Sequence, residues 1–360
     1  MALGFLKRFW PVVLVVAVLA AAAVLFFLLR SPGSEQNGGD GVGAGGPLAV
    51  PLGINADPIL LAEKTTLSPD APFRWLVEDG TGYLFPVNGF KPGATYRLEI
   101  ASGQVGVNGE RLAAPITTTF SVREPRLLVM TVEGESLDLW MIDLAKQTSL
   151  ALTEGGGLYD YDVDQTGTRL VFSRVNLLGG YDLWMLDLNA RTLGEASLLV
   201  DCGTQICINP AFHPTGSWLA YTRMDASQFA GNTGLGWIWT VQTTSGETAQ
   251  LFQDPEVYGV NPQWSPDGSA LSFYDHSLSG IRIVKVINGE QFFLATGAPA
   301  VLGWSPRADY FLYSDFEPGS SLPVMVFVRG DLQKTQPAAI SAEMDRAFDL
   351  STPAISPRGD

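Results

Sequence analysis

The sequence is poor in the residues that most enzyme chemistry requires. Its 360 residues include two cysteines and two histidines, and only 16% are charged. So few cysteines and histidines offer little material for a zinc site, and no cofactor is expected. The charges sum to −15, and such a surface repels phosphate backbones, which argues against nucleic acid as a partner. Hydrophobic residues make up 46%, which is ample for a large core.

Sustained helical periodicity is also missing after the first thirty residues. The chain is rich instead in glycine (39) and proline (23), which punctuate short runs of β-branched and aromatic residues. Many short strands joined by tight turns predict an all-β protein. At this length, the chain has room for more than one domain.

One long stretch lacks charge altogether. Residues 10–29, "WPVVLVVAVLAAAAVLFFLL", follow Lys7 and Arg8. Twenty residues at about 1.5 Å each span a bilayer core of about 30 Å. Residues 1–30 are therefore predicted to be a cytoplasmic tip and a single-pass signal-anchor helix, with the rest of the chain extracytoplasmic, in the periplasm or at the cell surface. A cleaved signal peptide is the alternative; its apolar region is normally shorter. No cysteine follows that could carry a lipid anchor.

Residues 31–47 are Gly-rich and predict a flexible tether. Residues 48–124 predict a small β-sandwich, with strands at "FRWLVED", "GYLFPV", "TYRLEIA" and "ITTTFSV". The stretch "FKPGATYRLEI" followed by "GVNGERLAAPITTTFSV" resembles bacterial Ig-like and fibronectin-type domains. The resemblance implies that Tyr96 pins a corner of the sandwich. A generic β-sandwich is the alternative, and either would serve as a spacer or binding module.

The rest of the chain repeats. Five segments align: "YDVDQTGTRLVFSR" (161–174), "PAFHPTGSWLAYTR" (210–223), "PQWSPDGSALSFYD" (262–275), "LGWSPRADYFLYSD" (302–315) and "PAISPRGD" (353–360). In each, an apolar strand enters a tight turn in which proline suits an early position and glycine supplies a positive φ. The turn residues are Gly167, Gly216, Asp267 with Gly268, Ala308 and Gly359. Ala308 departs from the pattern, so either Asp309 carries the left-handed conformation there or this turn differs from the others.

A third and a fourth strand are expected between the turns. "LDLWMIDL" (137–144) and "YDLWMLDL" (181–188) are near duplicates, and segments 236–243, 280–287 and 323–330 fill the same place. Segments such as 148–153 and 291–296 supply fourth strands. Four strands in each unit of forty to fifty residues predict β-propeller blades over residues 125–360.

The phrase "WSPDGSALSFY" and its relatives resemble the repeats of the TolB-type propeller, the WD40-like PD40 repeat. The resemblance covers about Arg126 to Asp360 and implies the fold more than any function. Similar repeats occur in surface receptors and in the propellers of prolyl oligopeptidase-type peptidases. Because the segment at 126–153 holds only strands two, three and four, "TPAIS" near the C-terminus is a candidate first strand for it. Ala354 to Ser356 would then pair with Leu127 to Met130 and close a five-bladed ring. The alternative is a larger propeller that continues beyond Asp360. The closing Arg-Gly-Asp is interpreted as the fifth turn, not as an integrin ligand.

Few residues offer chemistry of their own. Cys202 and Cys207 ("CGTQIC") predict a local disulfide in an oxidising compartment. Asp160, Asp162 and Asp164 alternate in "YDYDVD" and form a weak calcium candidate; the alternative is a blade strand with one acidic face. No other metal site is predicted.

Catalysis has no support in the motifs. No "GxSxG" elbow accompanies His213 or His276, so no catalytic residue is assigned. The tryptophans of the repeats are expected to pack between blades: Trp140, Trp184, Trp237, Trp239, Trp264 and Trp304. The sequence predicts a non-enzymatic bacterial cell-envelope protein that binds a protein or glycan through its propeller. The alternatives are the N-terminal part of a membrane-anchored peptidase and a structural spacer or sensor.

Overall fold

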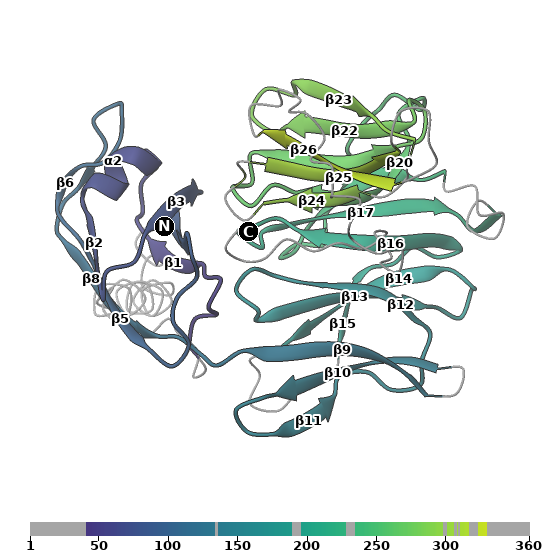
Figure 1. Cartoon of the computed structure of the whole chain (residues 1–360), viewed down its shortest axis with the longest axis horizontal. Helices are drawn as coiled ribbons and strands as arrows, with labels where there is room; N and C mark the ends of the chain where they lie inside the picture. The colour runs from purple at the N-terminus through teal and green to yellow at the C-terminus, as the bar shows by residue number, and fades with distance from the viewer. Residues whose placement is uncertain are drawn as a thin grey trace, which may run out of the picture. The chain divides into compact units, whose positions relative to one another are not determined.

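A computed structural model shows where these segments lie (Figure 1). It describes residues 41–133, 136–188, 196–227, 235–297, 301–305, 308, 310–316 and 323–329. The predicted anchor helix and the last repeat motif lie outside these residues. Within these ranges, no helix is both long and apolar enough to cross a bilayer.

The N-terminal domain consists of two small antiparallel sheets around one core. One sheet has the order β1-β4-β3 and the other β2-β5-β8. The elements are β1 (Leu48–Pro51), α2 (Pro58–Glu63), β2 (Thr65–Ser68), β3 (Phe73–Glu78), β4 (Thr81–Pro86), β5 (Thr95–Ile100), the short pair β6 (Gly103–Gln104) and β7 (Arg111–Leu112), and β8 (Ile116–Ser121). Tyr96 packs between Phe90 and Phe120, and its hydroxyl accepts a hydrogen bond from the Lys91 amide. The domain is a β-sandwich; its assignment to the Ig-like family stays a prediction.

This domain begins before the predicted end of the tether. Val42 is buried and forms a parallel bridge with Val122, and the Arg123 amide donates to the Val42 carbonyl at 2.9 Å. The prediction that residues up to 47 are a free linker is therefore wrong for residues 42–47. The Gly-rich composition of this stretch suggested a linker, but it contains Val42, which packs into the core of the domain.

The described residues between 126 and 329 form successive antiparallel units of the propeller-blade type, two of which, blades 2 and 3 below, are joined into one eight-stranded sheet by a single parallel pairing, Tyr181 with Ile206. β9 (Arg126–Glu133), β10 (Ser136–Asp143) and β11 (Thr148–Ala151) make the first, which we call blade 1. Blade 2 has β12 (Leu158–Val163), β13 (Arg169–Val175), β14 (Tyr181–Asp187) and β15 (Ser197–Val200). Blade 3 has β16 (Gln205–Phe212), β17 (Trp218–Asp225), β18 (Trp237–Gln242) and β19 (Thr248–Gln250). Blade 4 has β20 (Gly259–Trp264), β21 (Ala270–Asp275), β22 (Gly280–Lys285) and β23 (Gln291–Ala295). Blade 5 has β24 (Val301–Trp304), β25 (Tyr310–Phe316) and β26 (Pro323–Arg329).

The turn between strands one and two has the same hydrogen bonds in four blades. In blade 2, the Asp164 amide donates to the Arg169 carbonyl, and the Gly167 amide donates to the Asp164 carbonyl. His213, Ser265 and Ser305 begin the equivalent turns. The fourth turn residue always has a positive φ, including 57° at Ala308. Ala308 itself therefore takes the left-handed conformation, a strain that glycine avoids in the other blades.

Large aromatic side chains fill the spaces between blades. Trp184 packs against blade 1, Trp239 against blade 2 and Trp304 against blade 4. Trp264 lies between blades 3 and 4, where it contacts the core around Ala220. Trp304 also donates its indole N–H to the Ser272 hydroxyl at 3.1 Å, whereas the buried indole N–H of Trp264 has no hydrogen-bond partner among the described residues.

This difference predicts a stabilising substitution. Ala220 occupies in β17 the position that Ser272 occupies in β21, since each lies opposite the penultimate residue of its first strand. In Ala220→Ser, the new hydroxyl should accept from the Trp264 indole and donate to the Ala211 carbonyl. We expect the free energy of unfolding to rise by about 1 kcal/mol, because a buried donor gains a partner. Ser272→Ala should lower it by a similar amount in equilibrium urea unfolding. A loss of stability in Ala220→Ser would contradict the proposed equivalence of the two positions.

Candidate functional site

The two ends of the blades differ in what they contact. At the turn end, the Arg74 guanidinium donates to the Pro266 carbonyl at 2.8 Å, and Ser217 donates to Glu78 at 2.8 Å. Arg123 also donates to the Thr166 carbonyl. Turns of three blades are thus bonded to the N-terminal domain. Among the described residues, the opposite end of the blades, where strand two turns back into strand three, is the better placed to meet a partner.

The hairpin of blade 2 at this opposite end is held by one asparagine. The Asn176 amide oxygen accepts from the Leu178 and Gly180 amides at 2.9 and 3.0 Å. Its nitrogen donates to Asp182 at 2.9 Å and to the Gly203 carbonyl at 2.8 Å. All four hydrogen-bonding positions of the side chain are therefore in use, which fixes the loop. The loop nevertheless exposes two leucines, Leu177 (106% exposed) and Leu178 (67%).

The disulfide loop supports this hairpin from the next blade. Cys202 and Cys207 are joined by a disulfide, and both cysteines are buried against Leu183 and Val200. The Cys202 amide donates to the carboxylate of Asp182, which also accepts from Asn176. This placement makes the disulfide a structural brace beneath the leucine hairpin. The free thiols that metal binding requires are not available at this pair.

Blade 4 repeats the arrangement with different side chains. The buried Asp275 carboxylate accepts from the Arg282 guanidinium at 2.6 Å and from the Leu278 amide at 3.2 Å. Leu278 at the tip is half exposed. Beside it, the His276 ring lies against the rings of Tyr258 and Tyr274, and burial lowers the pKa of the histidine.

We call five exposed apolar residues at this end the free rim. They are Tyr159, Val175, Leu177, Leu178 and Leu278. Hydrogen-bonded loops that display leucine to solvent at two separate hairpins are typical of a binding surface, because exposed aliphatic side chains oppose solubility unless they are used. This surface was not predicted from the sequence. The signal available was "NLLGG", in which two leucines occupy a turn that usually carries polar residues.

The three aspartates of the calcium candidate do not form a metal site. Asp160 accepts from the Asn209 amide at 2.5 Å and Asp162 from the Phe212 amide at 2.7 Å, so both carboxylates bond the first strand of blade 3. Asp164 instead pairs with Arg169 at 3.1 Å inside its own turn. No group of three potential ligands occurs in the described ranges. The calcium candidate is therefore wrong, because each carboxylate is used in packing.

Burial shifts the pKa values of the two aspartates on β12, Asp160 and Asp162. It raises the pKa of Asp160 to about 6, against hydrogen bonds from Ser173 and Asn209 that lower it. It also raises the pKa of Asp162 to about 6, and the neighbouring carboxylates Asp164 and Asp160 add to the effect. These groups therefore change charge in a range where ordinary aspartates do not.

His213 belongs to a buried chain of hydrogen bonds. Its Nδ1 lies 2.7 Å from the Thr215 hydroxyl, which lies 2.6 Å from Ser217, and Ser217 donates to Glu78. Burial lowers the pKa of His213. His213 and Thr215 are both buried, so this chain joins blade 3 to the N-terminal domain and offers no accessible nucleophile.

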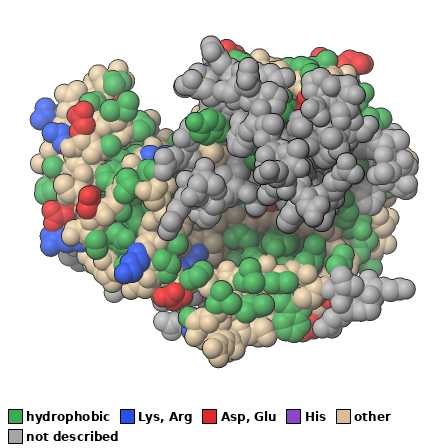
Figure 2. Space-filling model, viewed as in Figure 1, with side chains coloured by type: hydrophobic (Ala, Val, Ile, Leu, Met, Phe, Trp, Pro, Cys, Tyr) green, Lys and Arg blue, Asp and Glu red, His purple; other side chains and the backbone are tan. Residues whose placement is uncertain are grey.

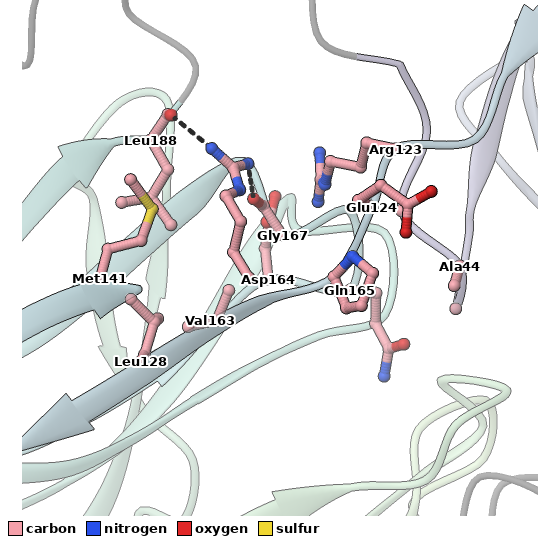
Figure 3. A pocket seen from close by; sticks show the side chains of 14 residues that line it. Ala44, Arg123, Glu124, Leu128, Met141, Val163, Asp164, Gln165, Gly167 and Leu188 are labelled. Atoms are coloured by element: carbon pink, nitrogen blue, oxygen red, sulfur yellow. Dashed lines mark hydrogen bonds between the residues drawn. The ribbon is translucent and has the colours of Figure 1, made fainter. Parts of the chain in front are cut away.

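A pocket of about 220 Å³ lies where blade 1 meets the N-terminal domain (Figure 3). Leu128, Met141 and Val163 form its apolar wall. Arg126 projects into it and donates to the carbonyls of Leu188 (3.3 Å) and Gly167 (3.4 Å). The arginine is thus tied to blade 2.

Comparisons with known proteins find similar solved structures, but they do not assign the chain to a family. No protein-family model and no curated protein matches the sequence. Among solved structures, TolB from Acinetobacter baumannii is 17% identical with a TM-score of 0.45, covering 66% of this chain and 57% of that one. A putative TolB from Agrobacterium tumefaciens is 17% identical with a TM-score of 0.46, covering 77% and 91%. An oligogalacturonate lyase from Vibrio parahaemolyticus is 15% identical with a TM-score of 0.47, covering 59% and 61%.

The resemblance to TolB noted in the sequence is thus found again among solved structures. The chain spans less than two thirds of the Acinetobacter TolB and of the lyase. At these identities and TM-scores, neither the activity nor the partners of those proteins extend to this chain. The propeller assignment rests on the repeated blades and turns described above.

Proposed function

We propose that this chain is a membrane-anchored, extracytoplasmic binding protein without catalytic activity. Its N-terminal helix would anchor it, the β-sandwich would act as a spacer, and the propeller would bind a protein or an envelope glycan. The observation that supports this proposal is the free rim, where hydrogen-bonded hairpins expose Leu177 and Leu178 at the end away from the N-terminal domain. Aliphatic residues on a rigid support favour a protein partner over a glycan, because they offer apolar area and few hydrogen bonds.

Substitution of the rim tests this function. We expect Leu177→Ser/Leu178→Ser, made in the full chain, to reduce capture of a partner from envelope extract about tenfold or more, as loss of a hot spot does. The measurement is quantitative pull-down with mass spectrometry. The fold should be unchanged, since both side chains are exposed.

Ile287→Ser is the matched control. Ile287 is also an exposed apolar residue, but it lies on the hairpin between β22 and β23, at the turn end of the blade. Its substitution should leave capture intact. Equal capture by the wild type and the rim variant would refute the role of the free rim, and failure of the wild type to capture anything would favour a structural spacer.

A further inference from the structure

Exposed carboxylates accompany the free rim. They come from the loops that lead from strand four of one blade to strand one of the next, and from the end of β17. The five residues are Glu154, Asp201, Asp225, Asp254 and Glu256. None of them forms an ion pair with another residue that the structure describes. The apolar side chains of the free rim are therefore set in an acidic surface.

The turn end of the blades is different, because lysines there neutralise exposed carboxylates. Lys146 lies 3.1 Å from Asp143 on the hairpin between β10 and β11. Lys285 lies 3.1 Å from Glu290 beside the hairpin between β22 and β23. Every propeller lysine that the structure describes is thus at the turn end. In the view of Figure 2, the basic side chains likewise lie mostly on and beside the N-terminal domain, which the turns contact.

The arginines of the free end are used within the fold. Arg174 donates to the backbone carbonyls of the loop before blade 2 at 2.7 and 3.2 Å. Arg223 lies over the Trp239 ring, 5.0 Å from its centroid. Arg282 is engaged by the buried carboxylate of its own hairpin. All three are partly or largely buried, whereas the carboxylates are exposed, so the surface that a partner meets is acidic.

Hydrogen bonds place acidic loops on both sides of the leucine hairpin of blade 2. The Val175 amide donates to a carbonyl of the loop before blade 2 at 2.9 Å, and this loop carries Glu154. The Asn176 side chain donates to a carbonyl of the loop before blade 3 at 2.8 Å, and that loop carries Asp201. The exposed Leu177 and its neighbour therefore lie between two carboxylates.

Blade 4 combines the same two features. The His276 amide donates to the Tyr258 carbonyl at 3.0 Å, which joins the hairpin of Leu278 to the loop before β20. This loop carries Asp254 and Glu256, both exposed. An exposed leucine beside an acidic loop thus occurs in two blades.

We infer that the partner of the free rim is a cationic amphipathic segment of another protein. Its aliphatic side chains cover the rim leucines, and its Lys or Arg side chains meet the surrounding carboxylates. The inference rests on the proposed function and adds the chemistry of the partner. Complementary charge around an apolar centre accelerates association and selects the partner, while the apolar centre supplies affinity.

Charge also argues against the other occupants of such a surface. A second copy of this chain has a formal net charge of −15 and would bring like charges to the contact. An anionic lipid surface is repelled for the same reason, since membranes attract basic segments. A basic segment of another protein is the occupant that satisfies both the leucines and the carboxylates.

Two synthetic peptides test this chemistry. Both are amphipathic helices of about 18 residues, or about five turns, with leucine on one face. One carries lysine on its other face, and the second carries glutamate there. With the full chain immobilised in an uncharged detergent, and detergent alone as the blank, we expect the lysine peptide to bind at least about tenfold more tightly. Equal affinities, or no binding of the lysine peptide, would overturn the inference.

Charge reversal shows where the lysine peptide binds. Glu154→Lys/Glu256→Lys should weaken its binding at least about tenfold. The fold should persist, because both side chains are exposed. The matched control is Asp70→Lys/Glu247→Lys, which changes the net charge equally at two exposed positions away from the free rim. This control should bind like the wild type, and an equal loss in both variants would refute a site at the rim.

Salt separates this inference from the proposed function. Between about 0.1 M and about 1 M NaCl, the Debye length falls from about 10 Å to about 3 Å. Capture of the partner from envelope extract by the full chain should therefore fall at least about tenfold. Capture that resists salt but is lost in Leu177→Ser/Leu178→Ser would exclude a cationic partner and leave the binding function intact. Capture that withstands both salt and the leucine substitutions would contradict both proposals.

Discussion

Gly180→Ala is expected to destabilise the protein by about 3 kcal/mol, although it adds a single methyl group. A Cβ at this position would lie 2.1 Å from the Gly203 carbonyl oxygen and 2.5 Å from that of Gln205. Both oxygens are backbone atoms of the disulfide loop, which Asn176 and Asp182 also hold. No flexible side chain can move away, so blade 2 and blade 3 must separate there.

Gly179→Ala is the neighbouring control. Gly179 has a φ of 79°, but a Cβ there would meet nothing within 4 Å. Its cost is backbone strain alone, about 1 kcal/mol. Equilibrium urea unfolding followed by tryptophan fluorescence measures both variants. Equal losses in the two would mean that the contact between blades at Gly180 contributes nothing.

The fold was predictable because its repeat depends on local chemistry. The turns favour proline early, as in the turns that begin at His213, Ser265 and Ser305, and they place a left-handed residue at the fourth position; these features recur at blade spacing in the sequence. The strands lie between the turns, where the sequence also repeats: the near-duplicate segments 137–144 and 181–188 form β10 and β14. Glycine is not indispensable, since the turn at Ala308 forms without it. The hydrogen bonds shared with the other blades determine the turn, and the residue accepts the strain.

The candidate site was less predictable because it depends on what the next blade supplies. Alternation correctly places Asp160 and Asp162 on one face of β12, but nothing local reveals that Asn209 and Phe212 provide their donors. The role of Asn176 is equally hidden in the sequence, because asparagine is common in turns. In the structure, its side chain orders both the hairpin and the disulfide loop. Contacts between blades join residues about fifty positions apart, so their partners appear only in three dimensions.

The same dependence on the next blade gives the β12 carboxylates a pH-dependent effect on stability. The pKa of Asp162 is about 6 in the folded protein, against about 3.9 in an unfolded chain. Between these values, the folded state binds more protons than the unfolded state. The free energy of unfolding is therefore highest, as far as this carboxyl is concerned, below about pH 4. It falls as the pH rises from 4 through 6, because the folded protein must then ionise a buried group.

Asp162→Asn should remove this dependence. The amide oxygen can still accept from the Phe212 amide, and it carries no charge to desolvate. We expect the variant to match the wild type near pH 3.5, where the Asp162 carboxyl is mostly protonated in both the folded and the unfolded state, and to exceed it by about 3 kcal/mol at pH 7.5. Urea unfolding at both pH values measures the difference, and the low-pH agreement is the internal control. Parallel curves with a constant offset would instead show that the carboxylate is as well solvated in the fold as in the unfolded chain.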